Sequence, residues 1–301
     1  MNTSPWPTLP PLADWQDTCS TLHLWTQVVG KVRLALGADL NHCWGVALYV
    51  TPRGLTTSAM PFATGSVQID FDFVDHALRV ETSEGKRASF ALEPMSVAAF
   101  YRRTMDALRE VGVEVQIWPV PVELPEVIPF EDDTEHASYD ADAVHVFWRA
   151  LVQADRVFTD FRARFVGKSS PSHFFWGAFD LAVTRFSGRT APQHPGGYPN
   201  IADRVMHEAY SHEVASAGFW PGSGLGEAAF YAYAYPTPDG FADRAVEPDA
   251  AYFYPDLGEF VLPYEAVRTA PDPDAALLAF LQSTYEAAAD LADWDRAALE
   301  R

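Results

Sequence analysis

The sequence predicts an α+β fold made of two similar halves, each a helix, an antiparallel sheet and a second helix, packed as one compact body. Three observations support this prediction. Apolar residues recur every three or four positions in several long segments, as they do in amphipathic helices. Short runs rich in β-branched and aromatic residues lie between those segments and are separated by turn residues. Similar short motifs occur in both parts of the 301-residue chain, which predicts an internal repeat.

The first half is predicted over residues 1–133 and begins with a helix at 15–36. The apolar stripe of this helix runs from Trp15 to Leu36, and Gly37 ends the helix. The elements that follow are strands at 44–51, 67–73, 77–81 and 88–92, a helix at about 95–111, and a Pro-rich acidic linker at 119–133. Short strands separated by turn signals predict an antiparallel sheet.

The second half is predicted over residues 134–301 and begins with a helix at about 141–166. It ends with a helix that starts at Asp272-Pro273-Asp274, which is a typical helix N-terminus. Val29-Gly30-Lys31 recurs as Val166-Gly167-Lys168, and in each half a histidine then precedes Trp-Gly and a strand. These correspondences support a second copy of the same unit.

The two copies differ in length, because the front motifs are offset by about 132 to 137 residues and the final helices by about 180. The difference predicts an insertion of about 45 residues in the second half, at about 187–227. We expect a helix at 201–217 within this insertion, with Asn200 as its N-cap. The second half is therefore predicted to carry a helical insertion.

The composition excludes several function classes. The chain has 21 Lys and Arg against 41 Asp and Glu, a formal net charge of −20, which disfavours binding to nucleic acids and to anionic membranes. No apolar run approaches the length of about 18 residues that spans a membrane, and the two cysteines lack disulfide or metal-ligand spacing. We expect a cytoplasmic protein whose partner is a small molecule, with an oligomeric state that the composition leaves open.

Four segments carry a resemblance to a known family: WQDT at 15–18, TPRGLTT at 51–57, SHFFWG at 172–177 and EAYSHE at 208–213. The chain resembles the bacterial DUF5996 family, a domain of unknown function, over nearly its whole length. The resemblance implies no reaction, no cofactor and no catalytic residues. The functional candidates below therefore rest on residue chemistry alone.

The predicted insertion is rich in groups that can transfer protons or bind metals. On a helix, Glu208 and His212 lie four residues apart and share a face, and a distant histidine such as His173 could join them. Three interpretations stay open: a structural surface pair, metal-free acid–base catalysis with Glu208 orienting His212, or a divalent metal site of His212, Glu208 and His173. His173, His207 and Tyr210 are further catalytic candidates.

A polar flank on the first helix is a candidate for substrate binding. His23, Gln27 and Lys31 are spaced by four residues and line up beside the apolar stripe. This flank either faces a cleft as a wall of hydrogen-bond donors or is an ordinary polar side of the helix. In the insertion, Trp220 is a further candidate for contact with a substrate.

Asp180 lies in an aromatic segment predicted to be a strand, where a charged carboxylate needs a partner. Arg185 and Arg189 are the expected partners, and a buried ion pair is one interpretation of this group. The other is that one of the two arginines faces a pocket and binds an anionic substrate group.

These candidates favour an enzyme that uses His/Glu acid–base chemistry, of hydrolase, lyase or isomerase type, on a small polar or anionic substrate. The alternatives are a non-catalytic protein that binds a small ligand and a structural or assembly protein. Loss of turnover when His212 and Glu208 are replaced would favour the enzyme, and a ligand that co-purifies without turnover would favour the binding protein.

Overall fold

The computed structural model describes residues 5–63, 65–124 and 127–301. The elements of the first half are α1 (Leu12–Leu36), the 3₁₀ helix η1 (Asn41–Val46), β1 (Tyr49–Thr51), β2 (Gly54–Thr56), β3 (Met60–Phe62), β4 (Gly65–Asp72), β5 (Ala77–Thr82), β6 (Arg87–Ala91) and α2 (Val97–Glu110). The strands form an antiparallel sheet in the order β1-β2-β4-β5-β6, with β3 paired to β4.

The second half repeats this plan. Its elements are α3 (Ala141–Ala163), β7 (His173–Phe175), β8 (Asp180–Thr190), α4 (Asp203–Ala209), β9 (His212–Trp220), β10 (Ala229–Tyr235), η2 (Phe241–Asp243), β11 (Tyr252–Tyr254), β12 (Glu259–Pro263), α5 (Tyr264–Arg268), α6 (Pro273–Leu291) and α7 (Arg296–Leu299). The strand order is β7-β8-β9-β10-β12-β11, again antiparallel. The predicted α+β class, with two antiparallel sheets, is confirmed.

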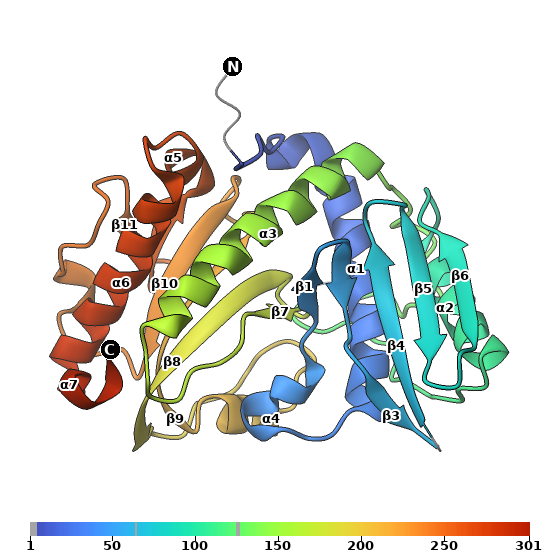
Figure 1. Cartoon of the computed structure of the whole chain (residues 1–301), viewed down its shortest axis with the longest axis horizontal. Helices are drawn as coiled ribbons and strands as arrows, with labels where there is room; N and C mark the ends of the chain where they lie inside the picture. Colours follow the sequence, from blue (N-terminus) through green and yellow to red (C-terminus); the bar gives the residue numbers. More distant parts are fainter. Residues whose placement is uncertain (1–4, 64, 125–126) are drawn as a thin grey trace.

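The two sheets meet edge to edge. Leu48, just before β1, and Phe174 in β7 form an antiparallel bridge with N–H···O distances of 2.9 and 2.8 Å. Figure 1 shows the halves side by side, with α1 and α3 toward the middle and α2 and α6 toward the two ends. The Trp15 and Phe147 rings join α1 to α3, with centroids 5.4 Å apart. The boundary at residues 133 and 134 stays a prediction.

The additional length of the second half lies in two segments rather than in one insertion. One segment joins β8 to β9 and contains α4, and the other joins β10 to β12 and contains β11. Between them, β9 is an interior strand paired to β8 and β10. The two Val-Gly-Lys motifs do not occupy equivalent positions, because Gly30 lies inside α1 whereas Gly167 follows the end of α3.

The helix predicted at 201–217 is wrong. The helix α4 ends at Ala209, and its N-cap position is Ala202 rather than Asn200. Nearly all of β9 is buried, so its small and apolar residues do not alternate with polar ones as in a half-exposed strand. Glu208 and His212 are consequently on different elements, and the helical spacing on which their pairing depended does not exist.

Side chains of β8 alternate between two faces of the second sheet. Arg185 points toward the helices, where its guanidinium lies over the rings of Phe161 in α3 and Tyr285 in α6, 3.5 and 4.4 Å from their centroids. Asp180 and Phe186 point to the opposite face, which the segment at 191–211 and η1 cover. No helix within the described ranges is both long and apolar enough to cross a membrane.

Candidate functional site

The predicted histidine and glutamate site does not assemble. The Glu208 carboxylate accepts a hydrogen bond from the backbone N–H of His42, at 3.0 Å, and not from His212. His212 lies near Ser211 Oγ, 3.1 Å from Nδ1, and its ring centroid is 5.5 Å from that of His42. His173 is in β7, beside Tyr49. Within the described ranges, no three His, Cys, Asp or Glu side chains are grouped to hold a metal ion.

The other candidates from the predicted insertion are His207, Tyr210 and Trp220, and they lie in different places. His207 lies beside the Gln193 amide, with N···N distances of 3.1 and 3.2 Å. Trp220 and Tyr210 lie on the covered face of the second sheet, where the Trp220 ring packs against Tyr231, with centroids 5.6 Å apart.

The expected pairing of Asp180 with an arginine is wrong. Arg189 instead forms a salt bridge of 2.7 Å with Glu213. Arg185 lies on the opposite face of β8 and donates to the Phe161 carbonyl at 2.5 Å and to Gln282 Oε1 at 3.3 Å. Arg185 thus has a structural role in holding α3 and α6 on the sheet, and Asp180 has a partner of another kind.

The polar flank of α1 holds two distant chain segments in place. Buried Gln27 makes reciprocal hydrogen bonds with the backbone of Val122, donating to its carbonyl at 3.0 Å and accepting from its N–H at 2.9 Å. His23 Nε2 lies 2.8 Å from the Gly177 carbonyl oxygen. Lys31 extends over the ring of Trp118, 4.8 Å from its centroid. The flank therefore positions the backbone directly before Glu123 and the turn before Asp180.

Asp180 is the buried centre of a carboxyl and tyrosine cluster. Only 6% of the residue is exposed, and the Tyr231 hydroxyl donates to its Oδ2. No partner for Oδ1 is present among the described residues. Burial raises the pKa of Asp180 to about 6, against the lowering effect of the Tyr231 hydrogen bond. A carboxyl with this pKa exchanges its proton near neutral pH.

Two further carboxyls face Asp180. Burial, together with the charge of Asp180, raises the pKa of Glu123 and that of Glu259 to about 7 each. Glu123 has a left-handed backbone with a φ of 60°, and its N–H donates to the Pro199 carbonyl at 2.9 Å. Such a conformation is strained for a residue with a side chain and tends to occur at functional positions. Glu259 comes from β12.

Tyrosines line the cluster and connect it to solvent. The hydroxyls of Tyr210 and Tyr233 are 2.8 Å apart, and the His194 ring stacks on Tyr210 at 4.7 Å between centroids. Tyr198 is 43% exposed, and burial raises its pKa with contributions from the charges of Glu123 and Glu259. Tyr198 thus lies close to both carboxyls and marks the side on which the cluster reaches the surface.

A family model described as a family of unknown function, DUF5996, matches residues 6–301. The chain belongs to this family. No curated protein and no solved structure matches it. The sequence resemblance to DUF5996 is thereby confirmed over essentially the whole chain, and the chemistry of this DUF5996 protein has to be inferred from its own side chains.

Two residues of the cluster were missed at the sequence level. Glu123 lies in the Pro-rich segment interpreted as a linker, and Glu259 lies in a short strand near many other acids. In a chain with 41 acidic residues, acidity alone does not single out either residue. The available signal was Gln27 in the apolar part of the first helix, because a buried amide requires hydrogen-bond partners and therefore indicates a neighbouring segment.

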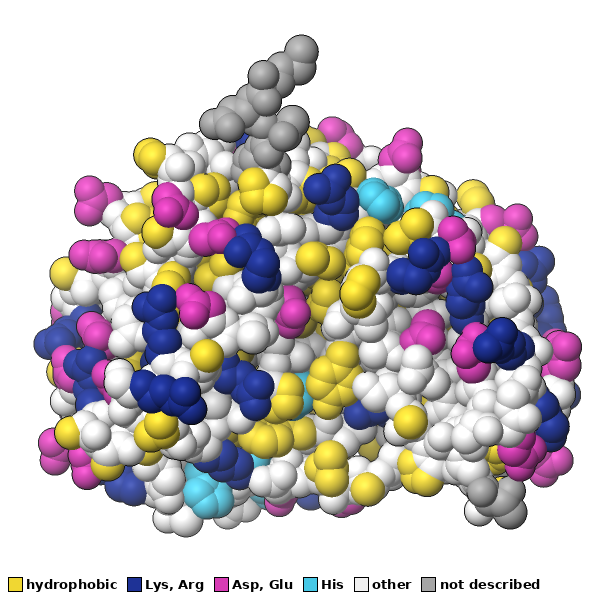
Figure 2. Space-filling model, viewed as in Figure 1, with side chains coloured by type: hydrophobic (Ala, Val, Ile, Leu, Met, Phe, Trp, Pro, Cys, Tyr) yellow, Lys and Arg dark blue, Asp and Glu magenta, His cyan; other side chains and the backbone are white. Residues whose placement is uncertain are grey.

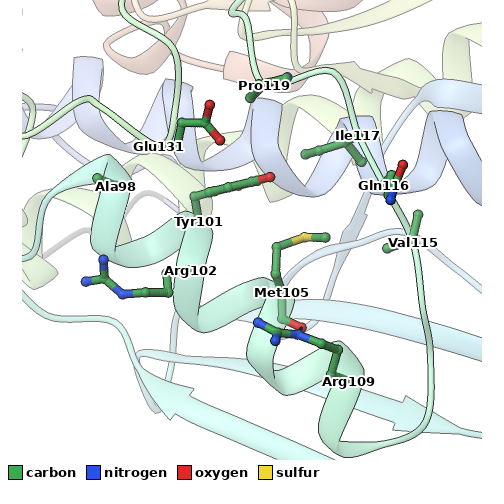
Figure 3. A pocket seen from close by; sticks show the side chains of 10 residues that line it. All are labelled: Ala98, Tyr101, Arg102, Met105, Arg109, Val115, Gln116, Ile117, Pro119 and Glu131. Carbon is green, nitrogen blue, oxygen red and sulfur yellow. Dashed lines mark hydrogen bonds between the residues drawn. The ribbon is translucent and has the colours of Figure 1, made fainter.

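A separate open groove lies on α2 of this DUF5996 protein. It has a volume of about 520 Å³ and lies between α2 and the segment at 115–119. Figure 3 shows Met105 and Tyr101 extending from α2 toward Ile117 and Pro119, with Glu131 at the rim. Its lining combines apolar side chains with exposed charges, so we place the candidate site at the carboxyl cluster instead.

Proposed function

We propose that this protein is an acid–base enzyme, of hydrolase, lyase or isomerase type, whose reacting groups are Asp180 and Glu123. The observation that carries the proposal is buried Asp180 beside half-buried Glu123 and Glu259, with no cationic partner among the described residues. Hydrogen bonds from α1 and the strained backbone of Glu123 hold this cluster in place. Burying unpaired carboxyls costs stability, and proteins retain such costs mainly where function requires them.

The chemistry follows from the proton occupancy of neighbouring carboxyls. Acids that repel one another in a poorly solvated site do not all ionise together, so at neutral pH some carry a proton and others do not. A protonated carboxyl donates to a leaving group or a carbonyl oxygen, and an ionised neighbour removes a proton from the substrate or from water. Asp180, with the lower pKa, supplies the base and Glu123 supplies the acid.

Tyr231 is the positioning residue of the pair. Its hydroxyl donates to Asp180 Oδ2, whereas the buried Oδ1 has no hydrogen-bond partner among the described residues. Gly177 keeps the site compact, because a Cβ at this position would lie 2.0 Å from Glu123 Oε1. The tyrosine rings around the carboxyls favour a small polar substrate that is uncharged or cationic at the reacting end, since an anion would be repelled there.

Screening for turnover tests the proposal. Purified protein is incubated with chromogenic glycosides, esters and amides and with a metabolite mixture, and conversion is followed by absorbance and by NMR. The matched pair of variants is Asp180→Asn and Asp256→Asn, since Asp256 is an exposed acid in the loop before β12. We expect wild type and Asp256→Asn to convert the same compound and Asp180→Asn to lose at least about 10²-fold in rate.

The same experiment separates the alternatives. Equal turnover by wild type and Asp180→Asn would overturn the assignment of the catalytic pair. A compound that binds wild type without conversion and fails to bind Asp180→Asn would replace the enzyme by a non-catalytic binding protein that uses the same cluster.

A further inference from the structure

A second group of polar side chains lies where the two sheets meet, outside the carboxyl cluster. Tyr49 in β1 and His173 in β7 flank the bridge between Leu48 and Phe174, and Arg33 in the last turn of α1 reaches the same place. Figure 2 shows hydrophobic side chains gathered along the middle of the molecule, between the halves, with basic and histidine side chains beside them. Each half contributes residues to this group around the Leu48–Phe174 bridge, which we call the seam.

Arg33 is a buried cation in the last turn of α1. Only 8% of the residue is exposed, and its guanidinium lies over the Tyr49 ring, 5.4 Å from the centroid. Within the described part of the chain, no carboxylate pairs with it and Nε has no hydrogen-bond partner. Arg185, another buried arginine, also has an unpartnered Nε, but its two terminal nitrogens donate to Gln282 and to the Phe161 carbonyl.

His173 is the second incompletely bonded group. It is 1% exposed and packed between the rings of Trp44, Tyr49 and Phe175, with centroids 5.4 to 5.6 Å away. Its Nε2 lies 3.4 Å from the Tyr49 hydroxyl, and Nδ1 has no partner among the described residues. Tyr49 is therefore the residue that touches both Arg33 and His173.

More positive charge lies on the far side of Trp44. The Lys168 ammonium lies 5.2 Å from the centroid of the Trp44 ring and 2.5 Å from Nε2 of His42. His42 Nδ1 lies 3.2 Å from the Glu208 carbonyl oxygen, so Nε2 accepts the hydrogen bond from Lys168. Two cations and two histidines are thus gathered at one seam in a chain whose net charge is −20.

We propose that Arg33, Tyr49 and His173 form a binding site for a small oxyanion, a phosphate or a carboxylate group. A guanidinium donates two parallel hydrogen bonds to such a group, and a tyrosine hydroxyl and an imidazole N–H supply further donors. An anion bound here provides the counter-charge that Arg33 lacks and a partner for His173. This site is independent of the acid–base chemistry proposed for Asp180.

Calorimetric titration of the full chain with sodium phosphate and with sodium acetate, at constant ionic strength, tests the proposal. We expect wild type to bind at least one of the anions, and Arg33→Gln to bind it about tenfold or more weakly. Arg164→Gln removes the same charge from an exposed residue paired with Asp160, and is expected to bind like wild type. Tighter binding of phosphate identifies a phosphate site, and tighter binding of acetate identifies a carboxylate site.

Three results would overturn the proposal: wild type binds neither anion, Arg33→Gln binds as well as wild type, or Arg164→Gln weakens binding as much as Arg33→Gln. If Arg33→Gln does not fold, Tyr49→Phe takes its place, because it removes only a hydroxyl and is expected to weaken binding about threefold. Unchanged affinity in Tyr49→Phe would then overturn the proposal. Asp180→Asn is expected to bind the anion normally, which separates this test from that of the enzyme.

Discussion

Replacing Asp180 by Asn should stabilise the protein, and more so at pH 8 than at pH 5. The folded-state pKa of Asp180 is raised from 3.8 to about 6, so ionisation of this carboxyl favours the unfolded chain. The cost is absent below pH 3.8, grows as the pH rises, and is complete above pH 6. The Asn side chain has no charge to bury, yet it can still accept the hydrogen bond from Tyr231.

The magnitude follows from the shift in pKa. About two pH units correspond to a cost of about 3 kcal/mol at pH 8, at 1.36 kcal/mol per unit. At pH 5 roughly half of this cost is already present, so the stability difference between Asp180→Asn and wild type should widen by about 1 to 2 kcal/mol from pH 5 to pH 8. The unpaired Asn amide adds the same cost at pH 5 and at pH 8, so it does not change the difference between the two pH values.

Urea unfolding followed by tryptophan fluorescence at pH 5, 6.5 and 8 measures this difference. Asp256→Asn serves as the control, since an exposed acid is expected to give a difference that stays within about 0.5 kcal/mol at every pH. A difference between Asp180→Asn and wild type that is constant, or that narrows toward pH 8, would refute the assignment of Asp180 as a buried acid with a raised pKa.

Three further changes test the parts of the site. Gln27→Ala should lower the free energy of unfolding in urea by about 2 to 3 kcal/mol, because the Val122 backbone loses both hydrogen-bond partners. The control Gln16→Ala changes an exposed glutamine and should lower it by under about 0.5 kcal/mol. Equal effects of the two variants would contradict the positioning role of Gln27. Gly177→Ala should lower turnover by displacing Glu123, and wild-type turnover would show that the contact is unimportant. His212→Gln should leave turnover within about threefold of wild type, since it lies outside the carboxyl cluster, and a loss of about 10²-fold would restore the histidine interpretation.

Local patterns predicted the long helices well and missed the strand β9. The apolar stripe from Trp15 and the Asp272 N-cap place α1 and α6 close to their observed bounds, because helix periodicity and capping are local. The strand β9 was predicted as a helix because it is buried on both faces and therefore lacks an alternating pattern. Short, fully buried segments of this kind are ambiguous without their neighbours.

The candidate site depended on contacts between residues far apart in the chain. Gln27 was identified as a functional candidate, but its partner Val122 is 95 residues away and is recognised through the backbone, which no side-chain pattern records. Asp180 was recognised as a carboxylate that needs a partner, and the partner is a tyrosine 51 residues later rather than a nearby arginine. Tertiary packing decides both pairs.

The most direct test of the central claim is a pH titration of the side-chain carboxyl carbons by NMR, in protein labelled with ¹³C at aspartate and glutamate. We predict an aspartate resonance that titrates with a pKa of about 6 and disappears in Asp180→Asn. Two glutamate resonances with pKa values of about 7 should shift to lower pKa in the same variant, because the charge of Asp180 raises both. An Asp180 resonance that titrates at or below pH 4 would contradict the account.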